Sequence, residues 1–274
     1  MPADAKRKLV SWENVTPGNT AYVDLPIDRD YPTIDIKVTA ISGGTPIADA
    51  AQAINKIRIL ANGVAFREFT VAQLRQINGV NGGLPGQYNP QNLLYLRIHG
   101  REDWLWNGQN ATMLNTSGLS TLRIEVELNV GITQPVLGGI YSFVPKRAIP
   151  AGSNVVRKVR VRRVDFAAIG EKDFRNLTYN GQLRRLHLEG PIVASARFEV
   201  SNAPIFDHNR EEQVLLLERN EMVPTSGYFV IPFDETQEID AGLPAAMLKE
   251  GVLFITPNAT GGVNIVEEYM EAIA

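Results

Sequence analysis

The sequence predicts an all-β protein built from two tandem antiparallel sandwiches, and three observations predict this fold class. Hydrophobic residues recur with a period of two, which is typical of strands with one buried and one solvated face. Such strands form antiparallel sheets, because parallel strands covered by helices would be apolar on both faces. The order of features starts again after about residue 156. At 274 residues and 44% hydrophobic composition, the chain can bury two cores.

The first half of the chain contains five runs in which alternate residues are apolar. Within each run the apolar residues share one face of the predicted strand, and polar residues such as Asp35 and Lys37 occupy the other. The predicted buried residues are Ala21, Val23, Leu25 and Ile27, then Ile34, Ile36, Val38 and Ala40, then Ile57 and Ile59, then Leu94, Leu96 and Ile98, and last Leu122, Ile124, Val126, Leu128 and Val130.

Two similar hexapeptides, ANGVAF at 61–66 and SNAPIF at 201–206, indicate an internal duplication. Each follows an apolar strand and precedes a helix signal with the spacing of a capping box, which is Thr70 with Gln73 in one half and Asn209 with Glu212 in the other. A loop with Gly or Pro and a further strand, at 93–99 and at 228–233, complete both series. Matching features in one order predict two copies of one unit, with one residue of slippage between strand and turn.

The pattern divides the chain into a basic N-terminal arm at 1–10, a first unit at 11–144, a linker at 145–156 and a second unit at 157–274. Pro145, Pro150 and Gly152 interrupt both helix and strand in the linker. Each unit has many short strands and one or two short helices. This composition predicts two eight-stranded jelly rolls, each a sandwich of two four-stranded sheets, with short helices in loops.

Composition and motifs give little support for catalysis. The chain has no cysteine, which excludes thiolate metal sites, disulfides and cysteine nucleophiles. The three histidines, His99, His187 and His208, are far apart and form no His-x-His pair, and there is no Gly-x-Ser-x-Gly motif. A net charge of −3 gives no global attraction to nucleic acid. We therefore expect no enzymatic activity, no required cofactor and no sequence-specific nucleic-acid binding.

Two groups of basic residues are candidate interface residues. Lys6, Arg7 and Lys8 form the basic N-terminal arm, which is expected to be disordered or to reach phospholipid headgroups or a neighbouring subunit. Lys158, Arg160 and Arg162 lie on one side of a predicted strand. No aromatic residues interleave with them, as nucleic-acid binding would require, so we expect them to pair with an acidic patch on a neighbouring subunit.

Two tryptophans and a carboxylate cluster are further candidates. Trp104 and Trp106 share one face of an extended segment, and paired tryptophans either stack on a sugar ring or fill a subunit contact, of which the contact is favoured. Asp234, Glu235, Glu238 and Asp240 could hold a hard cation such as calcium. Their spacing matches no known calcium loop, so a solvated acidic loop is the favoured interpretation.

Two segments resemble a known family. Residues 14–39, with Pro17-Gly18-Asn19 before a strand that ends in Leu25-Pro26-Ile27, resemble the opening strands of corticovirus major capsid proteins, and residues 263–274 resemble the closing strand. These are double jelly-roll coat proteins of tailless icosahedral phages with an internal membrane. The resemblance implies a coat protein that is made in the host cytoplasm and resides in the virion.

The same resemblance implies that three copies form a trimer of pseudo-hexagonal outline, and that these trimers assemble with other capsid proteins into a shell around a membrane and genome. Members of the family can hold calcium ions, so structural calcium is expected, with no ligand assigned to any residue. The alternative function is that of a carbohydrate-binding or adhesion jelly roll, such as a minor capsid or spike protein, in which the two tryptophans bind the sugar.

Overall fold

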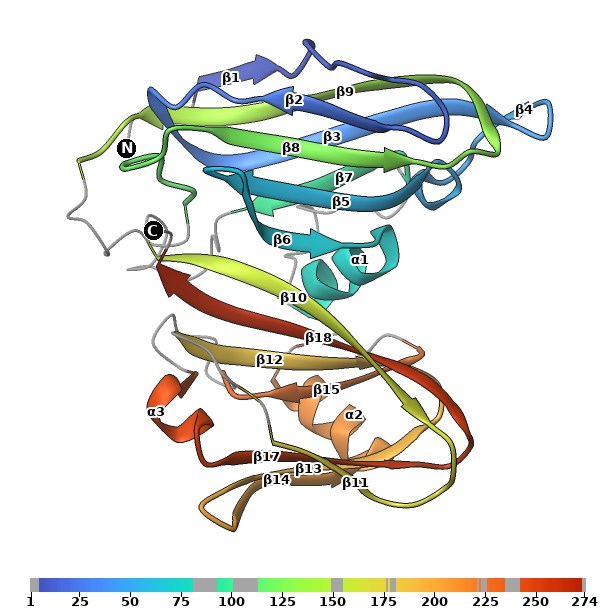
Figure 1. Ribbon diagram of the computed structural model, residues 1–274, viewed down its shortest axis with the longest axis vertical. Helices are drawn as coiled ribbons and strands as arrows, with labels where there is room; N and C mark the ends of the chain where they lie inside the picture. The colour runs from blue at the N-terminus through green and yellow to red at the C-terminus, as the bar shows by residue number, and fades with distance from the viewer. Residues whose placement is uncertain are drawn as a thin grey trace. The chain divides into compact units, whose positions relative to one another are not determined.

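The alternating segments of the sequence form antiparallel strands, and the chain divides into two units that are described one at a time (Figure 1). The first unit contains β1 to β9 with α1, and the second contains β10 to β18 with α2 and α3. The computed structural model describes residues 5–80, 93–100, 113–148, 155–175, 177, 181–220, 222, 226–234 and 242–272. No helix in these ranges is long and apolar enough to cross a membrane.

The first unit is a sandwich of two antiparallel sheets. One sheet has the strand order β1-β9-β3-β7, and the other has the order β2-β8-β5-β6. The main strands are β1 (Ala5–Lys8), β2 (Thr20–Asp24), β3 (Arg29–Ser42), β5 (Ile54–Ala61), β6 (Val64–Phe69), β7 (Tyr95–Gly100), β8 (Leu122–Leu128) and β9 (Ile132–Pro145). The short β4 (Thr45–Pro46) pairs with β3, η1 (Ala50–Gln52) precedes β5, and α1 (Val71–Val80) follows β6.

The second unit is also a sandwich of two antiparallel sheets. Its sheets have the orders β10-β18-β12-β15 and β11-β17-β13-β14. Its main strands are β10 (Val155–Phe166), β11 (Lys172–Phe174), β12 (Gln182–Glu189), β13 (Val193–Val200), β14 (Ala203–Asn209), β15 (Tyr228–Pro232), β17 (Gly251–Pro257) and β18 (Gly261–Ala272). The helix α2 (Arg210–Arg219) follows β14, while β16 (Leu243–Pro244) and α3 (Ala245–Leu248) precede β17.

The two units have the same topology. If the eight main strands of either unit are numbered along the chain, one sheet has the order 1-8-3-6 and the other has the order 2-7-4-5. This is the strand order of a jelly roll, so the predicted fold of two tandem eight-stranded jelly rolls is confirmed. The order could not be read from the periodicity, because alternation marks which face of a strand is buried but not which strands are neighbours.

Each of the two hexapeptides lies at a two-residue hairpin turn. Asn62 and Gly63 connect β5 to β6, and Ser201 and Asn202 connect β13 to β14. All four residues have positive φ, as a type I′ turn requires, and asparagine and glycine tolerate that backbone best. The two turns are 139 residues apart, from position 62 to position 201. Asn62 and Asn202 therefore occupy consecutive positions of the repeated turn, so the visible sequence match is one residue out of register with the structural repeat.

The capping boxes keep the structural register. Thr70 precedes α1 and Asn209 precedes α2, again 139 positions apart. Backbone N–H of Gln73 donates to the Thr70 hydroxyl at 3.3 Å, and backbone N–H of Glu212 donates to the Asn209 side chain at 3.0 Å. The Gln73 and Glu212 side chains accept from the capping residues in return, so both predicted helices begin as the sequence indicates.

The predicted core is largely confirmed. Residues at alternate positions of β2, β3, β5, β7 and β8 are buried, and the second unit has its own core around Leu186, Phe198 and Leu253. The prediction for Val130 was wrong, because β8 ends at Leu128 and Val130 is 80% exposed beyond it. Ile27 and Leu94 are only half-buried, since each lies just outside its strand.

Candidate assembly surfaces

The basic N-terminal segment is the first strand of the first jelly roll. β1 pairs with β9 so that Lys8 lies opposite Ile140, and the Arg7 guanidinium lies 5.3 Å from the Phe143 ring. The next residue, Leu9, is buried, and its N–H donates to the Gly139 carbonyl at 2.9 Å. These contacts hold the segment on its own jelly roll, while the side chains of β1 itself remain exposed.

The same segment continues to the second sheet of that unit. Glu13 forms a backbone bridge with Tyr22 at the edge of β2, with hydrogen bonds of 2.8 and 3.1 Å. Residues 5–13 therefore cover an edge of each sheet, which removes backbone groups that would otherwise pair with another chain. The expected contacts of Lys6, Arg7 and Lys8 with lipid or a neighbour stay a prediction.

The basic row on β10 has acidic partners within its own unit. Lys158 lies 3.0 Å from Glu271, and Arg162 forms an ion pair with Glu267. Arg160 lies over the Tyr269 ring at 5.8 Å. The carboxylates that the sequence analysis placed on a neighbouring subunit are thus supplied by β18 of the same chain. Arg160 is the exposed member of the row, and the role of all three residues in an interface stays a prediction.

The opposite face of the same sheet carries a buried charge cluster that the sequence analysis missed. Glu268 on β18 lies 3.0 Å from Arg157 on β10 and 3.3 Å from His187 on β12. All three residues are buried. The runs LRRLHL and VEEYM look like strands with a solvated face, so nothing in the pattern distinguishes these charges from surface charges. The cross-strand location of His187 agrees with the sequence-based interpretation.

Asp234 joins two further arginines in that unit. Its carboxylate lies 2.6 Å from Arg184 and accepts two hydrogen bonds from Arg185, at 2.7 and 2.8 Å. All three side chains are fully buried. The expectation of a solvated acidic loop was therefore wrong for Asp234, because both carboxylate oxygens bind guanidinium groups. Glu235, Glu238 and Asp240 lie outside the described residues.

The cluster around Glu268 makes stability depend on pH. Burial by itself raises the pKa of the Glu268 carboxyl, but the charge of Arg157, the hydrogen bond with His187 and the charge of Arg185 together bring that pKa well below its ordinary 4.5. The unfolded chain therefore binds a proton at a higher pH than the folded chain does. The stabilisation is complete above pH 4.5 and is lost as the pH falls towards the folded-state pKa.

We expect Glu268→Gln to weaken this pH dependence. The free energy of unfolding, measured by urea denaturation between pH 7 and pH 3, should fall less steeply with acid in the variant than in the wild-type protein. Glu171→Gln is the control, because Glu171 is an exposed partner of Arg197. Parallel pH profiles for Glu268→Gln and the wild type would contradict the assignment.

A second buried carboxylate anchors the end of the first unit. Asp30 accepts hydrogen bonds from the Asn115 side chain at 2.7 Å and from the backbone N–H of Thr116 at 3.1 Å. It also accepts from the backbone N–H and Nε of Arg147, at 3.1 and 3.2 Å. Asp30 therefore fixes the loop before β8 and the first residues after β9 to β3.

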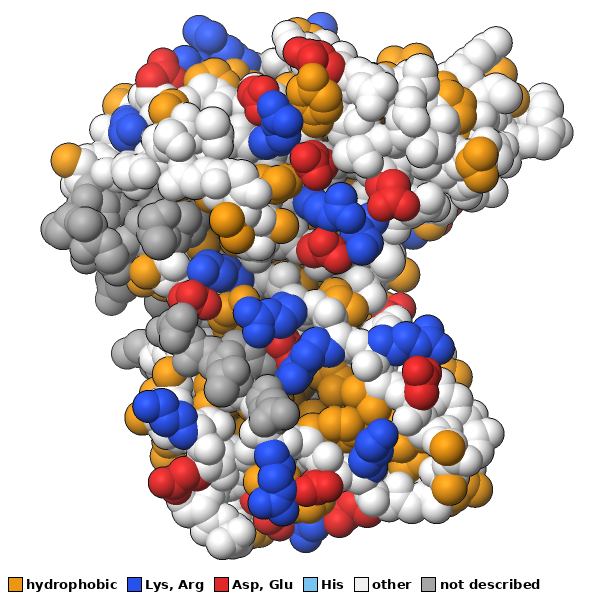
Figure 2. All heavy atoms as spheres, viewed as in Figure 1, with side chains coloured by type: hydrophobic (Ala, Val, Ile, Leu, Met, Phe, Trp, Pro, Cys, Tyr) orange, Lys and Arg blue, Asp and Glu red, His pale blue; other side chains and the backbone are white. Residues whose placement is uncertain are grey.

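The outer face of the β2-β8-β5-β6 sheet is covered by interleaved charges, which lie over β5 and β8 in Figure 2. Glu68 binds both Lys56 and Arg58, at 2.8 and 2.9 Å, and Arg58 also reaches Glu125 at 3.6 Å. Such exposed cross-strand pairs contribute little individually and mainly keep the face soluble. The predicted solvated face of this sheet is present.

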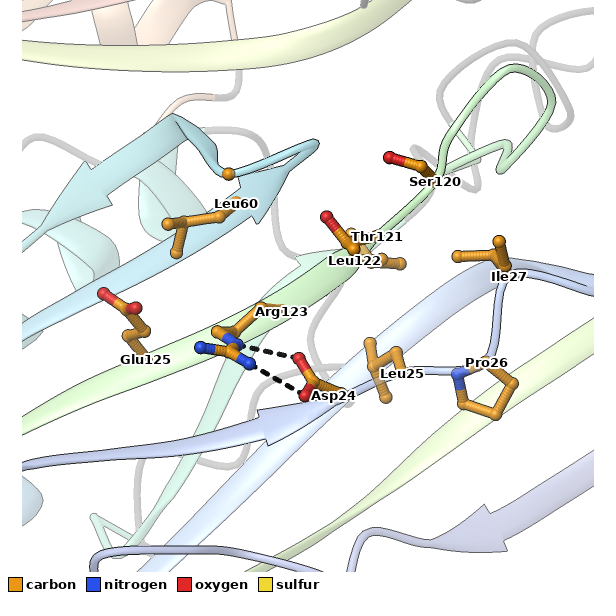
Figure 3. Close-up of a pocket in the computed structure, with 11 residues that line it drawn as sticks. Asp24, Leu25, Pro26, Ile27, Leu60, Ser120, Thr121, Leu122, Arg123 and Glu125 are labelled. Carbon is orange, nitrogen blue, oxygen red and sulfur yellow. Dashed lines mark hydrogen bonds and ion pairs between the residues drawn. The ribbon is translucent and has the colours of Figure 1, made fainter.

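An open depression of about 680 Å³ lies at one end of this face (Figure 3). Leu25, Pro26 and Leu60 line its apolar part. At its rim Arg123 donates to both oxygens of Asp24, at 2.7 and 2.9 Å, and its guanidinium lies 4.3 Å from the Tyr22 ring. The charges of the rim thus bind one another, which makes the depression a structural feature of the sheet end.

The outer face of β1-β9-β3-β7, here called the basic sheet face, combines cations with exposed apolar residues. Val136 is 61% exposed and Ile140 is 44% exposed, both on β9. Tyr95 on β7 is exposed beside Lys37, whose ammonium lies 5.1 Å from the ring. The charged side chains of the face are Lys6, Lys8, Lys37 and Arg97, with Asp35 as the carboxylate that binds Arg97 at 2.9 Å. This apolar and basic surface has the composition of a protein contact.

Two sets of candidate residues receive no structural placement. Trp104 and Trp106 lie outside the described residues, so their contact or sugar-binding role stays a prediction. Among the described residues, no group of three or more His, Asp or Glu side chains is arranged to hold a metal ion. The arginine-bound Asp234 carboxylate does not fit a calcium ligand.

Comparison with known proteins matches the whole double sandwich. The profile of the viral coat protein P2 N-terminal domain matches residues 6–142, and that of the viral coat protein P2 C-terminal domain matches residues 156–273. A search of curated proteins finds no match. The structure is similar to the crystal structure of the major capsid protein P2 from bacteriophage PM2, with a TM-score of 0.83, 17% identity and 98% of each chain covered.

More distant double jelly rolls are similar as well. PBCV-1 VP54 matches with a TM-score of 0.69 and 9% identity over 98% of this chain and 94% of its own. The STIV MCP matches with a TM-score of 0.66 and 9% identity over 97% of this chain and 96% of its own. At these identities the similarity of the structures concerns the fold, while the two domain profiles concern the family.

Proposed function

Since the chain belongs to the viral coat protein P2 family and is a coat protein of the virion capsid, we propose that three copies form a homotrimeric, pseudo-hexagonal capsomer. The observation that supports this proposal is the repeat of one topology within the chain. Three chains supply six similar jelly rolls, which can fill a hexagonal tile. A single jelly roll per chain would need six chains for the same outline.

The capsomers are proposed to assemble with one another and with other capsid proteins into an icosahedral phage shell around a membrane and genome. Many modest contacts between identical tiles give a stable shell even where each contact is weak. The covered sheet edges at β9 and β2 favour such side-chain contacts over indiscriminate strand pairing. This function is structural and requires no catalysis, and the net charge of −3 does not favour binding of nucleic acid.

Contact with membrane lipid is proposed for the basic side chains of β1, which are exposed on the first unit. Their charge would attract anionic headgroups over distances shorter than the screening length. Structural calcium is also proposed as a component of the capsomer, without assigned ligands. Its test is part of the experiment on capsomer mass.

The native mass tests the proposed capsomer. Light scattering of the purified protein is expected to give about 91 kDa, which is three times 30.2 kDa. A loss of that mass in a calcium chelator would support bound calcium, whereas an unchanged mass would argue against a calcium-dependent trimer. A monomer of 30.2 kDa at micromolar concentration would contradict the capsomer and favour a binding module.

A further inference from the structure

The repeat allows each surface of one jelly roll to be compared with its counterpart in the other. In the second unit, the outer face of the β10-β18-β12-β15 sheet is buried. Arg157, His187, Val266, Glu268 and Met270 lie on that face, and each is less than 10% exposed. Its counterpart in the first unit is the basic sheet face of β1-β9-β3-β7. There Val136 and Ile140 are exposed, so one repeated surface is buried in one unit and uncovered in the other.

The helix after the fifth strand shows the opposite difference. In α1 of the first unit, Val71, Gln73, Leu74, Gln76 and Ile77 are all buried. In its counterpart α2, only two of the helix residues are buried, which are Gln213 and Leu217.

A single repeated position shows the contrast most clearly. At the 139-residue offset, Leu215 on α2 corresponds to Gln76 on α1. Leu215 is 65% exposed, whereas Gln76 is 1% exposed. The apolar side chain is therefore in solvent at the position where the polar one is buried. This inversion is costly for an isolated subunit and is explained if α2 is covered in the assembled protein.

The surface around α2 is acidic, and it is here called the acidic helix face. Glu211, Leu215 and Glu218 have the spacing of one helical face and are exposed. The preceding strand adds Asp207 and the apolar Ile205, which is also exposed. The only cation among the exposed residues of α2 is Arg219. The basic sheet face carries four cations against one carboxylate, so the two uncovered surfaces are complementary in charge and both have apolar centres.

We propose that the basic sheet face of one copy binds the acidic helix face of a second copy. This inference rests on the proposed trimer and identifies its contact surfaces. Because the two faces are different, the contact is heterologous, and successive copies related by one rotation close into a ring. Val136 and Ile140 supply the apolar centre on one side, and Leu215 supplies it on the other.

The test uses one substitution on each face of the full-length protein. Ile140→Arg adds a cation to the basic sheet face, and Leu215→Asp adds a carboxylate to the acidic helix face. Both residues are exposed in the single chain, so unchanged circular dichroism and unfolding midpoint should show that the variants fold. Val130→Arg and Ile169→Asp are the matched controls, since they place the same charges at exposed apolar residues outside both faces.

Light scattering is expected to give about 91 kDa for the wild type and both controls, and 30.2 kDa for each face variant. A 1:1 mixture of the two face variants is the decisive sample. Ile140→Arg retains an intact acidic helix face and Leu215→Asp retains an intact basic sheet face, so the mixture should form one contact and give a dimer of about 60 kDa.

Two results would overturn this interface while leaving the proposed capsomer intact. In one, the face variants remain trimers like the wild type. In the other, both variants are monomeric but their mixture stays at 30.2 kDa, because two faces that bind each other must rescue one contact. A monomeric wild-type protein would overturn the capsomer, and the interface with it.

Discussion

Replacing Asp234 with asparagine is expected to lower the free energy of unfolding of the second jelly roll by about 3–5 kcal/mol. The carboxylate binds Arg184 and Arg185 at distances of 2.6 to 2.8 Å, and all three side chains are fully buried. The substitution leaves two buried cations without the negative charge that they share. Such a loss costs far more than the ion pair itself contributes, because the cations have already been removed from water.

Urea denaturation followed by circular dichroism measures this effect. Asp165→Asn is the matched control, because Asp165 pairs with Arg163 at 3.1 Å while both side chains are mostly exposed. An exposed pair of this kind should contribute about 0–1 kcal/mol. Equal effects of the two substitutions would show that burial of the arginines does not determine the stability of the second unit.

Replacing Asp30 with alanine is expected to destabilise the first jelly roll by a similar amount, about 3–5 kcal/mol. Asp30 accepts four hydrogen bonds, which come from Asn115, Thr116 and Arg147, and it is fully buried. Without it, several buried donors lose a charged acceptor, and the segment after β9 loses its attachment to β3.

Hydrogen exchange can localise this second effect. Residues 113–117 and 146–148 should exchange faster in Asp30→Ala, while β5 and β8 should remain protected until global unfolding. Asp28→Ala is the control, because the neighbouring Asp28 is largely exposed and binds only the adjacent Arg29 among its described contacts. Uniformly faster exchange across the first unit would contradict a local anchoring role.

Candidate contact residues were harder to predict than the fold. The exposed cations of β1 could be recognised from the sequence, but their place in the sheet depends on pairing with β9, more than 130 residues away. Leu215 was not recognised, because an apolar residue in a helix ordinarily indicates its buried side. The buried charges of Glu268 and Asp234 were likewise missed, because alternation with leucine and valine is the same for a covered face and a solvated one.

The sequence by itself determined the all-β class, the inward-facing residues of the strands, both capped helices and the duplication, because these depend on side-chain period and on contacts within four residues. Tertiary structure alone decided the strand order, the place of β1 in the first sheet and the one-residue offset between Asn62 and Asn202. It also decided which copy of each repeated surface is buried. These features depend on pairing and packing between residues distant along the chain, which leave no periodic signal in the sequence.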